Sequence, residues 1–300
     1  MTRIAFNEVR RNKVKSVFLI FIFVILILAL GMAIGLVFTG YSSIGVVIAV
    51  LVLVIYLPLA FFSGDKMVLS AMGAKPATKQ EHPHLFHTIE GLAIAAGIPT
   101  PKAYVIKDTA LNAFATGRDP KHGSITVTTG LMEKLNREEL EGVVAHEMSH
   151  IKNYDIRMML FAAVFVGAII LLSDMMLRGF LFGGGRGSNR EGNGNVIMIV
   201  IAIALAILAP LIAQLVKLSI SRKREYAADA AGALLTRYPP GLAHALKKIS
   251  KDPDPLVDKA NKATAHLFIS TPFRKKKGLW TKMWSTHPPI EERIKRLEQM

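Results

Sequence analysis

The sequence contains no cysteine, which excludes disulfide bonds and thiolate metal ligands. Any metal ion bound by this chain must therefore be held by histidine, aspartate or glutamate. Acidic residues are also few, since 22 aspartates and glutamates stand against 37 lysines and arginines. The formal net charge is +15, yet no signature of a nucleic-acid-binding module accompanies it. We therefore expect no nucleic-acid partner, and the basic excess needs another explanation.

Long apolar runs are what the sequence does contain. Residues 17–38 hold 22 consecutive uncharged side chains, about 33 Å as a helix, which is enough for the ~30 Å hydrocarbon core of a bilayer. The run is too long for a signal peptide, and no cleavage site of small residues is obvious. A second run covers 44–63 after a short loop. We predict that 17–63 is a transmembrane helical hairpin.

Two later apolar runs, 158–177 and 196–217, predict a second hydrophobic hairpin within 158–220. A glycine-rich connector joins them. The third run has only 16 residues before Asp174, about 24 Å as a helix, which is less than the thickness of the hydrocarbon core. The sequence alone therefore leaves open whether this second hairpin crosses the membrane completely.

The distribution of lysine and arginine gives the orientation, because these residues concentrate on the cytoplasmic side of membrane proteins. Residues 1–16 carry five of them, whereas the loop between the first two runs carries none. The N-terminus is therefore predicted to be cytoplasmic, and so are the soluble segments 64–157 and 221–300. This predicts a multi-pass protein of the cell membrane whose soluble parts face the cytoplasm. Anionic lipids on that side explain the basic excess.

The soluble segments show the mixed pattern of an α+β domain. A helix is predicted at 83–97, where Pro83 stands in the first turn. A further helix begins after Asn136, and Glu139 follows three residues later in the pattern of a capping box. Short strands, separated by turn residues, are predicted at 102–106, 112–116 and 124–128.

The helix after Asn136 carries HEMSHIKNYD, residues 146–155, which begins with the pattern H-E-x-x-H. Residues four apart lie one turn above each other on a helix, so His146 and His150 can bind one cation. Glu147 lies about 100° around the helix, beside the metal, where it can act as a base on a water molecule. Asp155 is interpreted as a cap or brace of the helix end and not as a ligand.

A catalytic zinc ion needs three protein ligands and one open position, so one ligand is still missing. The stretch SRKREYAADAAG, residues 221–232, places Glu225 and Asp229 four apart on one predicted helix face. We expect Glu225 to coordinate the metal and Asp229 to accept the N–H of a ligand histidine. The alternative is an ordinary acidic pair on a solvated helix. If the second hairpin is antiparallel, it brings Glu225 beside His150 at the membrane surface.

These features resemble the HtpX-type membrane metalloproteases, which are related to the CAAX prenyl endoproteases. The resemblance covers nearly the whole chain, including the N-terminal hairpin and the two later apolar runs. It rests on four motifs in order: NAFATG (112–117), HEMSHIKNYD (146–155), SRKREYAADAAG (221–232) and STHPPIEERIKRL (285–297).

The resemblance implies one zinc ion with Glu225 as its third ligand, and proteolysis of membrane or misfolded proteins at the cytoplasmic face. It also implies that Asn112 and Ala113, together with Phe114, lie on an edge strand that pairs with the substrate backbone. His287 would approach the reacting carbonyl.

We therefore predict an α-helical membrane protein with an α+β zincin-like (gluzincin) catalytic domain, built from 64–157 and 221–300. The predicted activity is that of a zinc metalloendopeptidase with polypeptide substrates. Zinc would polarise the scissile carbonyl, and Glu147 would take a proton from water and pass it to the leaving amine. His287 would donate to the developing oxyanion or, alternatively, cap the helix that follows it.

Three alternatives have to be weighed. A CAAX-type prenyl endoprotease would share the metal site, but that family has more spans around a large chamber than this chain has room for. A membrane chaperone that binds metal without cutting would share every binding feature, but it would have no need of Glu147. A transporter would leave the H-E-x-x-H motif unexplained, and the first two spans contain no charged residue.

Overall fold

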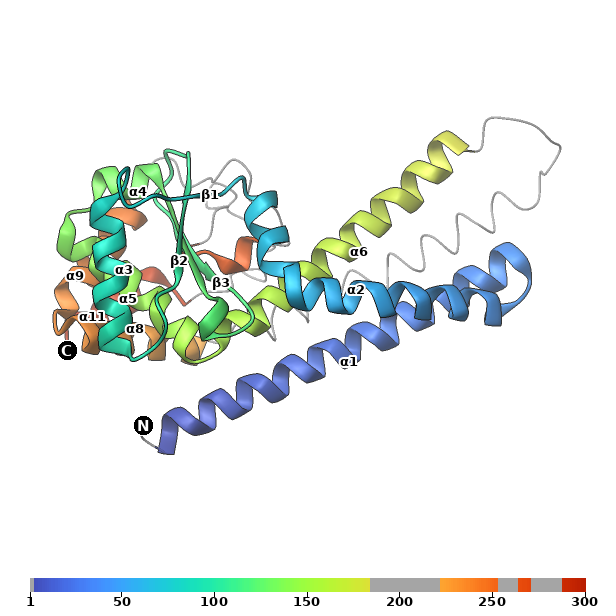
Figure 1. The fold of residues 1–300 in the computed structure, drawn as a ribbon, viewed down its shortest axis with the longest axis horizontal. Coiled ribbons are helices and arrows are strands. Elements are labelled where there is room, and N and C mark those ends of the chain that lie inside the picture. The colour runs from blue at the N-terminus through green and yellow to red at the C-terminus, as the bar shows by residue number, and fades with distance from the viewer. Residues whose placement is uncertain (1–2, 184–221, 253–263, 271–287) are drawn as a thin grey trace.

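The structure is a computed structural model that describes residues 3–183, 222–252, 264–270 and 288–300. It consists of a long helical arm and an α+β domain at one end of that arm (Figure 1). The arm holds the predicted membrane hairpin, and the domain holds the H-E-x-x-H helix. The predicted fourth span, 196–217, lies outside the described residues.

Each of the first two apolar runs forms one helix. The run 17–38 lies within α1, Arg3–Thr39, and the run 44–63 lies within α2, Ser42–Ala71. Among the described helices, these two are each long and apolar enough to cross a membrane. Both helices continue beyond the apolar runs at the end near the domain, so the arm passes into the domain without a flexible linker.

The helices α1 and α2 pack closely where their glycines face each other. Gly31 and Gly35 of α1 lie against Gly45 of α2, and a Cβ atom on Gly45 would stand 1.9 Å from the carbonyl oxygen of Gly31. No side chain fits at this position, so the two backbones are in direct contact. Small residues permit such an approach in membranes, where van der Waals packing holds helices together.

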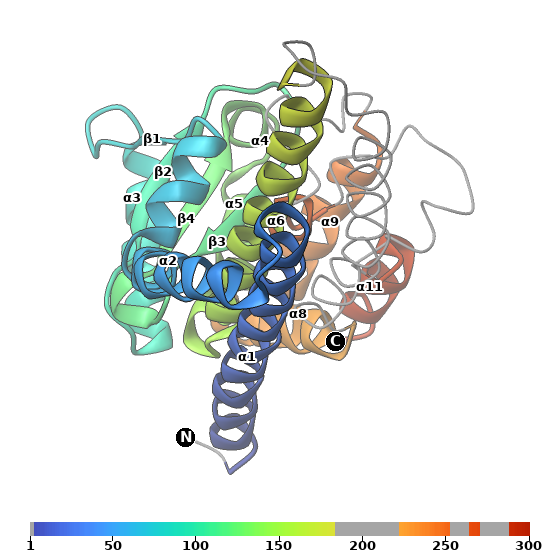
Figure 2. The same ribbon diagram turned by 90° about the vertical axis from the view of Figure 1, so that its right-hand side faces the viewer.

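A third long helix, α6, Asp155–Gly183, contains the predicted run 158–177. It packs against both α1 and α2, and Figure 2 shows the three helices together in front of the domain. The ring of Phe165 stacks on that of Phe23 in α1 at a centroid distance of 4.0 Å. The helix α6 follows the H-E-x-x-H helix after a bend of 85°.

The domain is built on a four-stranded mixed sheet with the strand order β1-β2-β4-β3. The strands β2, Lys102–Ile106, and β4, Ser124–Thr128, have the predicted bounds and pair in parallel. At one edge, β3, Ala113–Thr116, pairs antiparallel with β4 and begins one residue later than predicted. At the other edge, β1, Lys75–Pro76, pairs antiparallel with β2.

The sheet separates two apolar cores because successive side chains of a strand point to opposite faces. In β3, Ala113 and Ala115 face the first core, whereas Phe114 faces the second. The first core contains α3, Pro83–Ala96, and α5, Arg137–Lys152. The second core contains parts of α1, α2 and α6. One face of the sheet therefore supports the H-E-x-x-H helix α5, and the other supports the membrane arm.

The helix α5 lies at the centre of the domain. Its predicted capping box is confirmed: the Asn136 side chain accepts from the N–H of Glu139 at 2.9 Å, and the Glu139 carboxylate accepts from the N–H of Asn136 at 2.8 Å. Among the described helices after residue 221, α8, Arg222–Thr236, and α9, Pro239–Ser250, pack directly on α5, and α11, Ile290–Leu297, packs on α8 and α9.

Short helical elements complete the described part of the domain: α4, Thr129–Lys134, and the 3₁₀ turns η1, Pro120–His122, and η2, Ala265–Leu267.

The change Gly45→Ala is expected to destabilise the protein by about 1–3 kcal/mol, because the added methyl group has to push α1 and α2 apart. The apparent melting temperature in detergent measures this effect. Gly91→Ala is the matched control, since no atom lies within 4 Å of a Cβ at Gly91 in α3. There the same change should raise the melting temperature slightly, through the unfolded state. An unchanged melting temperature for Gly45→Ala would contradict the close contact.

Candidate metal centre

The helix α5 carries three of the predicted site residues into the interior of the domain. The exposed fractions of His146, Glu147 and His150 are 1%, 2% and 4%. The helix α8 crosses α5 closely because Gly232 faces its backbone, where a Cβ atom would stand 3.0 Å from the nitrogen of His146. Glu225 lies about two turns before Gly232 on the same side of α8, so this contact places Glu225 over the two histidines.

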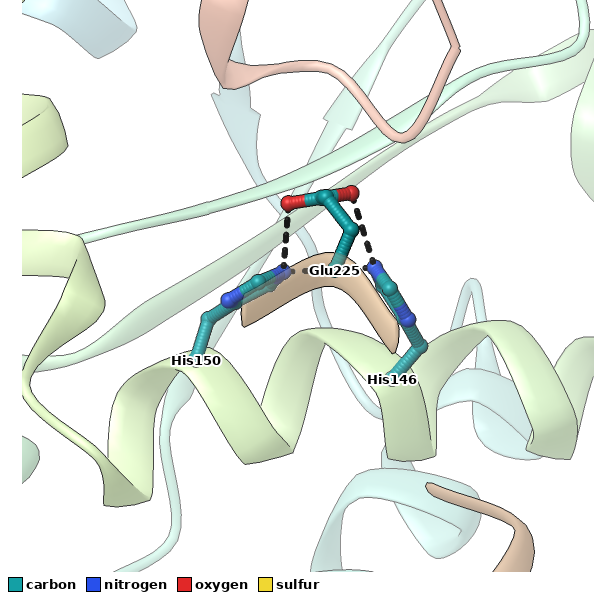
Figure 3. A group of neighbouring side chains, drawn as sticks. All are labelled: His146, His150 and Glu225. Atoms are coloured by element: carbon teal, nitrogen blue, oxygen red, sulfur yellow. Dashed lines mark hydrogen bonds and ion pairs between the residues drawn. The ribbon is translucent and has the colours of Figure 1, made fainter. Parts of the chain in front are cut away.

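The two imidazoles and the Glu225 carboxylate converge, as Figure 3 shows. The Nε2 atoms of His146 and His150 are 3.2 Å apart. Oxygens of Glu225 lie 3.9 Å from Nε2 of His146 and 3.6 Å from Nε2 of His150. Two nitrogens that bind one zinc ion tetrahedrally at about 2.0–2.1 Å stand about 3.3 Å apart, close to the observed spacing. The three side chains thus form a group that could hold one metal ion.

Each histidine binds a carboxylate through its second ring nitrogen. Nδ1 of His146 lies 2.9 Å from Asp229, and Nδ1 of His150 lies 3.0 Å from Asp155. A carboxylate accepts a hydrogen bond, so each Nδ1 carries the proton and each Nε2 keeps its lone pair for a metal. The donor set therefore fits zinc. Asp229 contacts a histidine as expected, and Asp155, expected only to brace the helix end, contacts the other.

The surroundings of His150 are strongly negative. Burial alone lowers the pKa of His150, but the hydrogen bond to Asp155 and the charge of Glu225 outweigh burial and raise the pKa to about 9. A field that stabilises a proton on a buried imidazole also stabilises a metal cation at the same place. The electrostatics of the site therefore agree with its ligand geometry.

Arg293 of α11 is a buried member of the site that the sequence analysis missed. Its Nε lies 2.9 Å from one oxygen of Asp229, and a terminal nitrogen lies 2.7 Å from the other. The guanidinium also lies 3.4 Å from Nδ1 of His146 and 3.9 Å from an oxygen of Glu225. The signal in the sequence was its spacing from Leu297, which places both residues on the buried face of α11.

This arginine keeps the Asp229 carboxylate charged in the interior. Burial alone raises the pKa of Asp229, but Arg293 and the hydrogen bond with His146 outweigh burial and lower the pKa to about 2. A charged carboxylate is the stronger acceptor for the N–H of His146. Arg293 therefore acts on the metal centre through Asp229.

Glu147 lies next to the three ligands without being one of them. The backbone N–H of Ala115 in β3 favours the charged form of the Glu147 carboxylate. Burial raises the pKa of Glu147 to about 7, against the opposing charge of His150. A carboxylate with a pKa near neutrality can take up and return a proton at cellular pH.

The edge strand β3 runs beside α5. At the start of β3, the free edge of the strand is occupied by a later segment of the same chain, residues 269–270. The N–H of Ile269 donates to the carbonyl oxygen of Ala113 at 2.9 Å. The side chain of Asn112 donates to the carbonyl oxygen of Ser270 at 3.0 Å and accepts from the N–H of Ser270 at 3.4 Å. Asn112 and Ala113 are therefore at the border of the site, hydrogen-bonded to residues 269–270 of the same chain.

Of the two remaining predicted site residues, one points away from this arrangement and the other lies outside the described residues. The side chain of Phe114 points into the second core, where its ring centroid lies 5.2 Å from that of Phe268. This follows from the alternation of β3, which turns Phe114 away from the face that supports α5. His287 lies outside the described residues, so its contact with a reacting carbonyl stays a prediction.

Comparison with known proteins adds an independent observation. A model of peptidase family M48 matches residues 79–300, which is most of the chain. The chain belongs to peptidase family M48. The matched region of the family includes the whole sheet except β1 and every residue of the metal centre described above.

Proteins similar in sequence or in fold cover most of this chain. A "Protease HtpX homolog" from Dictyoglomus thermophilum is 49% identical over 86% of this chain and 83% of its own length. A protein of the same name from Thermoanaerobacter pseudethanolicus is 45% identical over 100% of this chain and 99% of its own. The alignment with the crystal structure of S. mikatae Ste24p covers 97% of this chain and 67% of the Ste24p chain. The sequence identity is 21% and the TM-score is 0.49.

Membership of family M48 makes the protein a metallopeptidase, and the predicted enzyme class, fold class and HtpX-type resemblance are confirmed. The family implies a metal ion, generally zinc, and the group formed by His146, His150 and Glu225 fits one. The two apolar helices of the arm make it a membrane metallopeptidase.

The change Arg293→Met is expected to lower the free energy of unfolding by about 3–5 kcal/mol, because it leaves Asp229 buried without its guanidinium partner. Denaturant unfolding in detergent measures the change. Arg296→Met on the same helix is the matched control, since Arg296 and its partner Glu292 are half exposed. A far smaller change is expected there. Equal unfolding midpoints for the two variants would show that Arg293 does not support Asp229.

Proposed function

We propose that this M48 metallopeptidase is a zinc-dependent endopeptidase of the cell membrane. It cleaves misfolded or membrane proteins at the cytoplasmic face, and Glu147 is its general base. The observation that carries the proposal is the position of Glu147, which is buried beside the three ligands yet outside their set. A protein that only held metal or unfolded chains would gain nothing from this carboxylate, because burying one is costly.

Each residue of the site has a separate role in the proposed reaction. A zinc ion held by the three ligands would polarise the scissile carbonyl and lower the pKa of water. Glu147 takes a proton from the attacking water and returns it to the leaving amine. Asp229 and Asp155 hold the imidazoles that carry the metal.

The start of β3 is the proposed binding edge for the substrate backbone. There the N–H of Ile269 forms one backbone hydrogen bond of the kind that an extended peptide forms with an edge strand, and Ser270 binds the side chain of Asn112. This internal pairing supports Asn112 and Ala113 as substrate-pairing residues. Arg293 also donates to the carbonyl oxygen of Ile269 at 3.0 Å. A substrate peptide bound in the same place would accept this hydrogen bond from Arg293 through one of its own carbonyl oxygens. A substrate has to displace residues 269–270 in order to bind.

The orientation in the membrane is supported by the charge and exposure of the arm. Arg10, Arg11 and Lys13 are exposed on α1 at the end near the domain, whereas Gly40 and Tyr41 at the far end stand in a loop without lysine or arginine. The domain therefore lies on the cytoplasmic side by the positive-inside rule. Side chains suited to lipid are exposed along both helices: Val17, Phe18, Phe21, Ile25, Val47, Leu51, Val54 and Ile55.

The change Glu147→Gln is expected to leave zinc binding intact and to slow cleavage by about 10²- to 10⁴-fold, because only the base is lost. The measurement is cleavage of an unfolded protein in detergent, after a chelator has removed the metal and zinc has been added back. Glu141→Gln, the same change elsewhere on α5, is the control and should cleave at the normal rate.

Cleavage at the normal rate by Glu147→Gln would show that Glu147 is not the general base. A wild-type protein that binds zinc without cleaving would favour the chaperone alternative. Cleavage confined to prenylated C-terminal peptides would favour the CAAX-type alternative.

A further inference from the structure

The turn between α5 and α6 lies directly beside the metal centre. The helix α5 ends at Lys152, α6 begins at Asp155, and the two helices meet at 85°. Tyr154, between them, has a positive φ of 61°, which is uncommon for a residue other than glycine. A backbone in such a region keeps its geometry when the surrounding structure holds it.

Asn12 of α1 is one of the groups that hold this turn. Its side-chain amide donates to the carbonyl oxygen of Asn153 at 2.9 Å and to Oδ1 of Asp155 at 2.7 Å. The first bond satisfies a carbonyl at the C-terminal end of α5. The second fixes one oxygen of a carboxylate whose other oxygen, Oδ2, accepts from Nδ1 of His150 at 3.0 Å. One carboxylate thus joins α1 to a proposed metal ligand.

The burial of Asn12 has no explanation in packing alone. The residue is 0% exposed, and burying an amide is unfavourable unless its hydrogen bonds are made. Farther along α1, the buried side chains include Leu19 and Phe23, which belong to the apolar second core. A leucine at position 12 would serve packing equally well. What the asparagine adds is the pair of hydrogen bonds to the turn.

A second donor reaches the same carboxylate oxygen from α8. Nη1 of Arg224, the neighbour of Glu225 in the sequence, lies 3.3 Å from Oδ1 of Asp155. The contact from Asn12 is the shorter of the two, at 2.7 Å. Three helices, α1, α6 and α8, therefore meet at one buried carboxylate, and the best-formed bond to Oδ1 comes from the membrane helix.

We propose that Asn12 is a positioning residue of the metal centre, which orients the Asp155 carboxylate and through it the ring of His150. This inference rests on the proposed zinc site. It makes α1 part of the metal centre, although α1 lies outside residues 79–300, which the family model matches. A displacement of α1 relative to the domain therefore weakens zinc binding.

The test is the zinc dissociation constant of the full chain in detergent, measured by competition with a chelator. Asn12→Leu, which is similar in size and has no donor, should raise this constant about 3- to 10-fold, less than the ~10- to 100-fold expected for Asp155→Ala. Asn12→Ala is a second variant in case the leucine disturbs packing. Ser16→Ala is the matched control, because Ser16 is buried one turn later and its hydroxyl donates to the carbonyl oxygen of Asn12.

A double-mutant cycle separates positioning from a general loss of stability. In the Asp155→Ala background, Asn12→Leu should change the zinc constant by less than about twofold, because the carboxylate through which it acts is gone. An equal shift in both backgrounds would overturn the proposal. The proposal would also be overturned if Asn12→Leu and Asn12→Ala had the same zinc dissociation constant as the Ser16→Ala control. If the wild-type protein bound no zinc, that result would contradict the proposed zinc site and therefore also the role of Asn12.

Discussion

The pairing of each site histidine with a buried carboxylate is the interaction on which the rest of the structure depends. It leaves both Nε2 atoms able to bind a metal, and it places two negative charges in the interior, where isolated charge is costly. Each carboxylate is stabilised by a partner from another helix. Arg293 of α11 binds Asp229, and Asn12 of α1 binds Asp155. Helices of the domain and of the membrane arm therefore converge on α5.

The same arrangement places the proposed substrate site at the junction of the domain and the arm. The strand β3 has α5 on one face and the core of the arm on the other, and residues 269–270 occupy its outer edge at Asn112 and Ala113. A chain that replaces this segment has to offer an extended backbone, which folded proteins rarely expose. This requirement suits a protease that acts on misfolded or locally unfolded membrane proteins. It also agrees with a site whose ligands are almost completely buried.

Features with a local signal could be predicted from the sequence. The capping box of α5, the strands β2 and β4 and the spacing of the two histidines depend on residues a few positions apart. The missed features are contacts between distant parts of the chain. Arg293 and His146 are 147 positions apart, and Asn12 and Asp155 are 143 apart. Helical periodicity can place such a residue on a buried face, but it does not identify the partner across the core.

Two imidazoles and one carboxylate are proposed to hold a single zinc ion at the end of α5. X-ray absorption at the zinc edge, on protein purified without chelator, reports the ligands directly. We expect one zinc per chain with two nitrogen ligands at about 2.0–2.1 Å and a carboxylate oxygen beside them, and a changed spectrum for Glu225→Ala. Protein without stoichiometric zinc, or zinc without imidazole ligands, would contradict it.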